Sequence, residues 1–337
     1  MKKVVILATL ILALMSCSTE VDLIGDYEDI TVVYGLLNQT DSISYLKINK
    51  AFLGDGNALV MAQEPDSSSY RNDLTVILEE RKDGSVIKTF SFDTTSVYKK
   101  EEGTFYYPRQ IIYQCVTWNQ LDPEGEYRLT ITNRVSGKII TATTPLVSDF
   151  DILKPIINNP VKPTIHFPDN DSPKDLEWRS AKYGRLYNVV MRFHYKEMFN
   201  QVTDTLYKYI ETGYAPRKSQ SLDGGEEMLI QFANNSFYKL LENTVPYDPA
   251  KEATVEVRYA IAVEYIFSVA GDDFNTYMEV NDASGSIVQE RPEFSNVENG
   301  IGIFSSRYNK SRLYYISPLT EEILITKGLK FEPEIGK

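Results

Sequence analysis

Cysteine and histidine, the residues that most often build metal sites and nucleophilic active sites, are scarce in this chain. Its 337 residues include only two of each: Cys17, Cys115, His166 and His194. Two cysteines cannot staple a disulfide-dense scaffold, and no C-x-x-C pair is present to hold zinc. A G-x-S-x-G nucleophile elbow and a glycine-rich phosphate loop are also absent. We therefore assign no catalytic residue, no metal ligand and no cofactor, and we expect a protein that is not an enzyme.

Long hydrophobic runs are also scarce, and the one that stands out lies at the start of the chain. Val4–Leu14 is an apolar run of eleven residues that follows the positively charged Met1-Lys2-Lys3. A membrane-spanning helix needs roughly 20 apolar residues, so this run is too short to cross a bilayer and is typical of a signal peptide. We therefore expect residues 1–16 to be a signal peptide and the remaining chain to be soluble.

The end of that run, Leu14-Met15-Ser16-Cys17, resembles the lipobox of bacterial lipoproteins. The resemblance implies cleavage before Cys17, lipidation of its sulfur and a short lipidated tether over residues 17–28. Ser18 follows the cysteine where an aspartate would signal inner-membrane retention. Several acyl chains, each contributing about 0.8 kcal/mol per buried CH₂, anchor a protein firmly. We therefore expect lipid on Cys17 to attach the protein to the outer membrane, on its periplasmic or cell-surface face.

Positively charged residues are fewer than negatively charged ones. The chain has 35 Lys and Arg against 47 Asp and Glu, which gives a formal net charge of −12. Loss of Lys2 and Lys3 with the signal peptide would make the mature chain −14, since −12 − 2 = −14. An acidic surface repels nucleic-acid phosphate and anionic lipid headgroups. We therefore expect no nucleic-acid partner.

Aromatic residues are abundant, with 23 Tyr and 15 Phe, and they favour β structure. In residues 121–131, Leu121, Pro123 and Tyr127 are spaced L-x-P-x-x-x-Y, which resembles the tyrosine corner of fibronectin type III and immunoglobulin-like domains. Lys82-Asp83-Gly84-Ser85 lies between two strand-like runs and predicts a hairpin. These features predict an immunoglobulin-like β-sandwich over residues 29–148.

Proline clusters between the two halves, with five in residues 149–175, which predicts an interdomain connection. The alternating stretches 186–196 and 255–269 beyond it predict antiparallel strands with one face in water. Short helices are expected near 237–245, 272–278 and 320–326. The expected fold is thus mainly β: an N-terminal immunoglobulin-like sandwich, then a second antiparallel β-rich domain with a few short helices over residues 176–337.

The other candidates for metal binding, reactivity or ligand stacking have ordinary structural explanations. Asp169-Asn170-Asp171 and Asp272-Asp273 lack calcium-loop spacing and fit turns. Cys115 lies among apolar residues and fits a small buried hydrophobe. The run Phe105-Tyr106-Tyr107-Pro108, together with Trp118, offers aromatic rings for stacking on sugars, although such rings more often pack a sandwich. A glycan is therefore one candidate ligand.

The whole chain resembles an uncharacterised family of Bacteroidota lipoproteins, a domain of unknown function. The most distinctive stretch is Ser295-Asn296-Val297-Glu298-Asn299-Gly300-Ile301-Gly302-Ile303-Phe304, supported by Leu121–Tyr127, Ser136–Lys138, Trp178 and Tyr187–Tyr195. The resemblance implies an envelope protein, and for some members of the family it implies association with a TonB-dependent outer-membrane receptor. The leading hypothesis is a non-enzymatic protein that binds a ligand or a partner. The alternatives are a surface adhesin or assembly subunit, and a carbohydrate-active enzyme.

Overall fold

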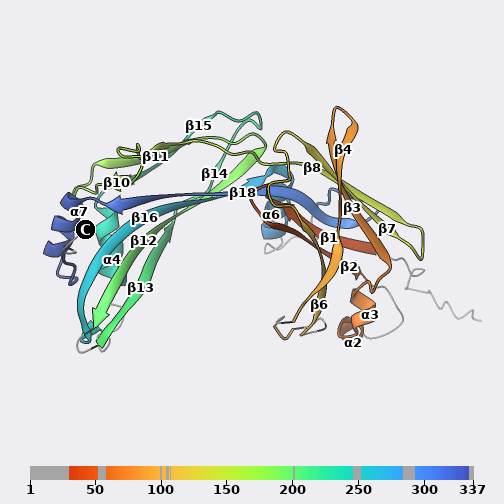
Figure 1. Cartoon of the computed structure of the whole chain (residues 1–337), viewed down its shortest axis with the longest axis horizontal. Helices are drawn as coiled ribbons and strands as arrows, with labels where there is room; N and C mark the ends of the chain where they lie inside the picture. Colours follow the sequence, from red (N-terminus) through yellow and green to blue (C-terminus); the bar gives the residue numbers. More distant parts are fainter. Residues whose placement is uncertain are drawn as a thin grey trace, which may run out of the picture.

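The computed structural model describes residues 30–51, 58–98, 101–103, 106, 108–199, 202–245, 252–283 and 293–333. The expected signal peptide, Cys17 and the tether lie outside the described residues. The expectation of a mainly β fold is confirmed, with mostly antiparallel strand pairs and a few short helices (Figure 1). No helix among the described residues is long and apolar enough to cross a membrane.

A ten-stranded sheet forms the inner layer of an arch (Figure 1). Its main path runs in the order β13-β12-β16-β18-β1-β2-β6-β5, with β14 beside β12 and β10 beside β18. The strands are, in chain order, β1 (Ile30–Leu37), β2 (Ile43–Ala51), β5 (Asp93–Val97), β6 (Gln110–Val116), β10 (Thr164–Ile165), β12 (Gly184–Phe199), β13 (Val202–Gly213), β14 (Arg217–Lys218), β16 (Val255–Gly271) and β18 (Ile301–Ile316).

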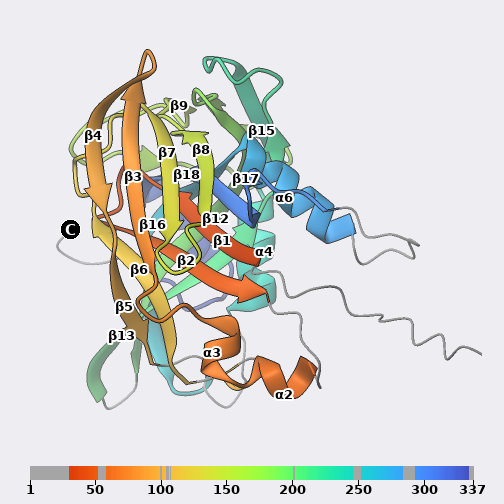
Figure 2. The same ribbon diagram turned by 90° about the vertical axis from the view of Figure 1, so that its right-hand side faces the viewer.

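Two smaller sheets form the outer layer of the arch. A five-stranded sheet of order β17-β8-β7-β3-β4 faces the viewer in Figure 2, and a three-stranded sheet of order β15-β11-β9 covers the other half. Their strands are β3 (Leu74–Lys82), β4 (Ser85–Ser91), β7 (Glu126–Asn133), β8 (Ile139–Pro145), β9 (Ile152–Lys154), β11 (Pro173–Arg179), β15 (Glu227–Ala233) and β17 (Val297–Glu298).

The helices are short and lie at the ends and the middle of the arch (Figure 1). They are α2 (Ala58–Ala62), α3 (Pro65–Ser68), α4 (Ser236–Thr244), α6 (Asp272–Ala283) and α7 (Pro318–Thr326). The helices expected near 237–245, 272–278 and 320–326 are therefore confirmed. Helix α3 begins at Pro65, a residue well suited to a first helical turn.

Strand β18 connects the two halves of the arch. Residues 301–306 pair in parallel with β1, and residues 307–315 pair antiparallel with β16. We call residues 30–145 with 297–306 the N-terminal arm, and residues 150–271 with 307–333 the C-terminal arm. The sequence placed residues 176–337 in a second domain beyond the connection at 149–175. In the structure, residues 297–306 of that stretch lie in the sheets of the N-terminal arm.

Each arm has its own hydrophobic core between the inner and outer layers. The N-terminal core consists mostly of aliphatic side chains such as Val33, Leu46 and Leu78, with a smaller set of aromatic rings: Tyr70, Phe90, Phe92, Tyr113, Tyr127 and Phe304. The C-terminal core contains Trp178, which is fully buried, and a large set of aromatic rings: Phe150, Phe167, Tyr187, Phe193, Phe237, Tyr238, Tyr265, Phe267 and Tyr314.

Two local sequence predictions in the N-terminal arm are confirmed at the level of hydrogen bonds. The hydroxyl of Tyr127 accepts a hydrogen bond from the backbone N–H of Asp122 at 2.6 Å and donates to the carbonyl of Asp122 at 3.2 Å, as a tyrosine corner requires. Asp83 and Gly84 turn the β3–β4 hairpin with positive φ of 50° and 79°, the pattern of a type I′ turn.

Two other predictions need correction. The alternation in 255–269 suggested that Tyr259 and Ile261 share the buried face, but the register of β16 against β12 shifts between Ala262 and Ala260. This β-bulge turns Tyr259 and Ile261 towards the open face and leaves Arg258 buried. Cys115 is only half-buried at the edge of the N-terminal core, because it lies on β6 near the free edge of the sheet.

Candidate functional site

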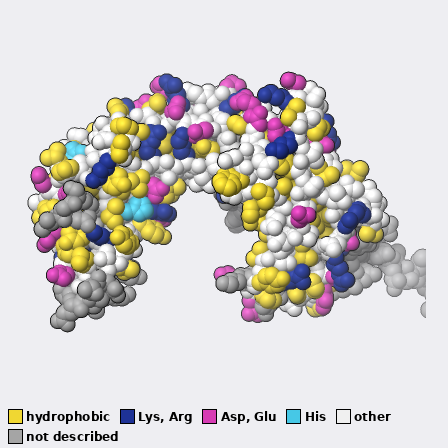
Figure 3. Space-filling model, in the orientation of Figure 1, with side chains coloured by type: hydrophobic (Ala, Val, Ile, Leu, Met, Phe, Trp, Pro, Cys, Tyr) yellow, Lys and Arg dark blue, Asp and Glu magenta, His cyan; other side chains and the backbone are white. Residues whose placement is uncertain are grey.

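The inner face of the ten-stranded sheet carries the most unusual surface of the protein. Even-numbered residues of β18, such as Tyr308 and Tyr314, point into the core, whereas Asn309, Ser311 and Leu313 point away from it. No second sheet covers this side within the described residues. Because the sheet is arched, the uncovered side forms the hollow between the two arms (Figure 3), which we call the concave face.

A cluster of charged side chains lies on the concave face of the C-terminal arm. β12 presents Arg192 and His194, which face Glu211 of β13 and Glu264 of β16. Arg192 Nε donates to Glu211 Oε1 at 2.6 Å, and His194 Nε2 lies 3.1 Å from Glu264 Oε2. Burial alone would raise the pKa of Glu264, but hydrogen bonds from Ser311 and His194 hold that pKa below its usual range. The cluster is therefore a preorganised set of paired charges.

Exposed tyrosines surround this cluster. Tyr207 and Tyr209 of β13 are 72% and 59% exposed, and the guanidinium of Arg192 lies 4.7 Å from the ring centre of Tyr209. A shallow hollow of about 310 Å³ lies beside them, lined also by Ile261 and Leu313. Tyrosine and arginine bury large, amphipathic surfaces at little entropic cost and are the residue types that dominate binding interfaces.

β13 is also a free edge of the sheet. Tyr214 donates its backbone N–H to the carbonyl of Val189 at 2.9 Å, which fixes the alternation of hydrogen bonds between β12 and β13. By that alternation, the backbone groups of Tyr207, Tyr209 and Glu211 point away from β12. Backbone donors and acceptors along this edge are thus available beside the exposed tyrosines.

The concave face continues into the N-terminal arm. There Tyr34 and Tyr45 are 38% and 49% exposed, and the ring of Tyr34 packs edge-on against Tyr277 of α6. A second hollow of about 360 Å³ lies at this position, beside the ion pair of Arg307 and Asp41 at 3.2 Å. Exposed tyrosines therefore lie on both sides of the arch, facing the same hollow.

The structure separates the residues that the sequence singled out. His194 belongs to the charged cluster, but His166 lies elsewhere and bonds to Thr320, where burial lowers its pKa. The two histidines therefore do not meet. Within the described residues, no group of His, Cys, Asp and Glu is arranged to hold a metal ion.

Other candidates from the sequence have structural roles or lie apart from each other. Asp273 accepts a hydrogen bond from Asn296, and Asp169 pairs with Lys327. Tyr106 lines a separate pocket in the N-terminal arm, whereas Trp118 is 65% exposed in the turn after β6 and does not join it. Phe105 and Tyr107 lie outside the described residues.

Sequence reasoning missed β13, which carries the exposed tyrosines. In residues 205–211, apolar and aromatic residues occupy both faces of the strand, with Leu206 and Ile210 on one side and Tyr207 and Tyr209 on the other. Such a pattern hides the alternation by which a half-buried strand is recognised. The signal that was present is the repeated tyrosine beside lysine and glutamate in an otherwise strand-like run.

Comparisons with known proteins do not assign a family. No family model matches the chain, and no curated protein matches it. Among solved structures, one described as "Cytokine receptor complex - Crystal form 1A" aligns with 85% of this chain and 96% of that chain, at 9% identity and a TM-score of 0.24. A likeness this distant does not indicate a function.

Proposed function

We propose that this protein is a non-enzymatic, lipid-anchored binding protein of the outer membrane that holds a protein partner on its concave face. The observation that carries the proposal is the coincidence, on β13, of exposed tyrosine side chains with outward-pointing backbone groups. An extended segment of a partner can add a strand to such an edge and pack its side chains on the tyrosines.

The charged cluster supports a specific partner rather than general adhesion. Arg192, Glu211 and Glu264 are already paired with one another or with His194, so they do not need to be desolvated as isolated charges on binding. Paired charges around an aromatic centre set the orientation of a partner, while the tyrosines supply most of the contact energy.

The expected lipid anchor bears on where in the cell the protein would act. Lipid on Cys17, expected from the lipobox, would hold the arch at the outer membrane, where a receptor of the TonB-dependent class is the partner that we propose. The acidic surface, with its net charge of −12, supports a protein partner over nucleic acid.

Site-specific photo-crosslinking in intact cells tests this function. A photoreactive residue at position 207 of the full-length protein should crosslink to one outer-membrane receptor. The same photoreactive residue at position 135 should not crosslink to that receptor. Val135 is also open to solvent, at 81%, but it lies in the β7–β8 turn of the outer layer.

Binding measurements with the purified protein and the purified receptor then test how much the concave face contributes to the affinity. Tyr207→Ser with Tyr209→Ser should weaken binding of the identified receptor by about tenfold or more, since each tyrosine hot spot contributes at least about 1 kcal/mol. Equal crosslinking from positions 207 and 135, or unchanged affinity of the double variant, would contradict the proposal.

A further inference from the structure

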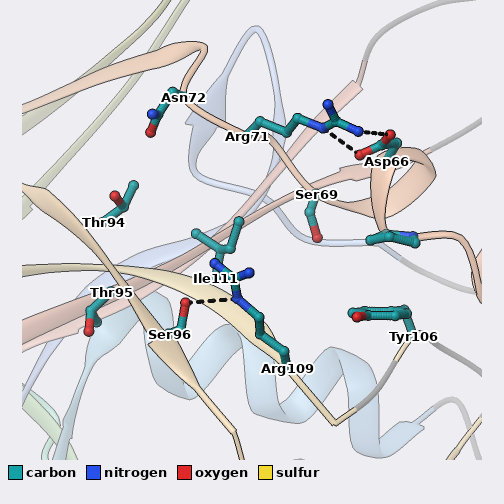
Figure 4. A pocket seen from close by; sticks show the side chains of 11 residues that line it. Asp66, Ser69, Arg71, Asn72, Thr94, Thr95, Ser96, Tyr106, Arg109 and Ile111 are labelled. Atoms are coloured by element: carbon teal, nitrogen blue, oxygen red, sulfur yellow. Dashed lines mark hydrogen bonds and ion pairs between the residues drawn. The ribbon is translucent and has the colours of Figure 1, made fainter.

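A polar pocket in the N-terminal arm lies apart from the concave-face residues used above (Figure 4). It encloses about 570 Å³, which is within the range of sites that bind small organic molecules. Its walls come from three segments: α3 with the residues after it, strand β5, and the start of β6 with the residues that lead into it. The lining includes Ser69, Arg71, Thr94, Ser96, Tyr106 and Arg109.

Two guanidinium groups lie in this pocket, but among the described residues only one of them is paired with a carboxylate. Arg71 is paired with Asp66 through its Nε at 2.7 Å and through a terminal amino group. Arg109 uses its Nε to donate to Ser96 Oγ at 3.1 Å, and no carboxylate of a described residue pairs with it. The lining residues thus carry one excess positive charge, in a protein whose net charge is −12.

The terminal amino groups of Arg109 favour an anion with two oxygen acceptors. Its Nε donates to Ser96 Oγ, and no described residue accepts a hydrogen bond from its terminal amino groups. A carboxylate or sulfate can accept two parallel hydrogen bonds from such a fork. The anion would therefore bind the terminal amino groups, while the hydrogen bond to Ser96 restrains the side chain.

The remaining lining suits a ligand rich in hydroxyl groups. Hydroxyls of serine and threonine both donate and accept hydrogen bonds, and Asn72 adds an amide that does the same. Tyr106 provides an aromatic ring for the apolar face of a sugar. The backbone N–H of Tyr106 donates to the carbonyl of Ala62 at 2.9 Å, so the ring is held at the rim by α2.

We propose that this pocket binds an anionic saccharide, with Arg109 holding a carboxylate or sulfate group and Tyr106 stacking on the sugar ring. A simple inorganic anion would leave most of the 570 Å³ and all of the hydroxyl lining unused. A neutral sugar would leave the charge of Arg109 without a partner. The proposal does not depend on the concave face, because none of its residues line this pocket.

Titration calorimetry with three trisaccharides tests the proposal on the purified, folded protein. The probes are trigalacturonate, a sulfated galactotriose and unmodified galactotriose. We expect at least one anionic probe to bind at least about tenfold more tightly than the neutral one, since a charge-assisted hydrogen bond contributes more than 1.4 kcal/mol. Comparing the first two probes distinguishes a carboxylate from a sulfate.

Substitutions of the lining residues test whether the saccharide binds in this pocket. Arg109→Met should weaken the preferred anionic probe by about tenfold or more, and Tyr106→Ser should weaken all probes alike. Arg179→Met, which removes an exposed arginine at the end of β11 in the other arm, is the matched control and should change nothing. Thermal unfolding confirms that each variant folds, and Tyr207→Ser with Tyr209→Ser should leave saccharide binding intact.

Three outcomes would overturn the proposal. One is equal binding of the neutral and anionic probes, which would remove the role of the charge. Another is unchanged affinity in Arg109→Met, which would place the saccharide elsewhere. The third is the absence of heat and of ligand-detected NMR contacts for every probe at millimolar concentration.

Discussion

In the N-terminal arm the inner sheet is covered by five strands, whereas in the C-terminal arm it is covered by three strands with helices α4 and α7. Under the wider cover, sheet packs against sheet over mostly aliphatic side chains. Under the narrower cover, large rings such as Trp178, Phe193 and Phe237 make up more of the core. Two arms of one sheet thus reach close packing with different side-chain sizes.

The arms also differ in buried charge. In the C-terminal arm, Arg258 and Glu197 are both almost fully buried and lie 2.9 Å apart, and Arg258 also binds Glu252. Arg258 donates a further hydrogen bond to the carbonyl of Leu329, which holds the end of the chain against β16. A buried pair of this kind is costly to break from one side and fixes how neighbouring segments meet.

The largest expected effect comes from the strand that the arms share. Gly302 of β18 has φ of +117°, and a Cβ built there would lie 2.0 Å from the carbonyl oxygen of Val33. Gly302→Ala should therefore separate β18 from β1 and cost at least about 3 kcal/mol of unfolding free energy. Gly103→Ala, where nothing lies within 4 Å, is the control.

Denaturant unfolding followed by tryptophan fluorescence measures this effect and tests whether the arms unfold together. With Trp118→Phe as background, the remaining buried Trp178 reports only on the C-terminal arm. Because β18 belongs to both arms, its transition should shift with Gly302→Ala. A transition at the same denaturant concentration would mean that the arms fold independently.

Local sequence patterns were enough to predict much of each arm. The alternation of Tyr187, Val189, Met191 and Phe193 follows directly from one buried and one open face of β12. The corner at Tyr127 and the turn at Asp83-Gly84 depend on residues close in sequence, so their chemistry can be read locally.

Longer-range features had no local signal. The parallel pairing of β1 with β18 joins residues more than 260 positions apart, as in Gly35 with Phe304, and depends on the whole topology. The bulge in β16 shifts its register against β12 between Ala262 and Ala260, so a perfect alternation from Val255 to Val269 misplaced Tyr259. Exposed Tyr207 and Tyr209 look like core tyrosines in sequence, because burial is decided by what covers the sheet.

A smaller effect is expected from the second acidic partner of Arg258. The hydrogen bonds from Arg258 lower the pKa of the Glu252 carboxyl below its ordinary value of 4.5. Its folded-state pKa is thus below the unfolded one, so its stabilisation is complete above about pH 4.5 and is lost as the pH falls through the folded value. Glu252→Gln should cost about 1.5–3 kcal/mol at pH 7.

Unfolding free energies of the wild type and Glu252→Gln across pH 7 to pH 3 check the sign. The difference between them should shrink below about pH 4.5, since the wild type loses the carboxylate there and the variant never had it. Glu256→Gln, an exposed position on β16 close to Glu252 in sequence, should differ little from wild type at either pH. A difference that stays constant with pH would show that the Glu252 charge does not contribute.

The smallest expected effects concern a hydrogen bond that occurs in both arms, from a backbone N–H to the hydroxyl of a buried tyrosine. In the C-terminal arm the hydroxyl of Tyr187 accepts a hydrogen bond from the backbone N–H of Ala181 at 2.7 Å, much as Tyr127 does with Asp122. Both tyrosines are fully buried, but Ala181 is buried whereas Asp122 is half-exposed. Removing the hydroxyl of Tyr187 therefore leaves the N–H of Ala181 buried without an acceptor. Removing the hydroxyl of Tyr127 leaves the N–H of Asp122 able to bond to water.

We accordingly expect Tyr187→Phe to cost about 2 kcal/mol and Tyr127→Phe about 1 kcal/mol, because an unsatisfied buried donor is costlier than a lost hydrogen bond. Chemical denaturation of both variants and of the double variant provides the measurement. The tyrosines lie in separate cores, so the two costs should add. If Tyr127→Phe proves the costlier change, the exposure of the donor does not decide the outcome, and the five-stranded cover of the N-terminal arm becomes the better explanation.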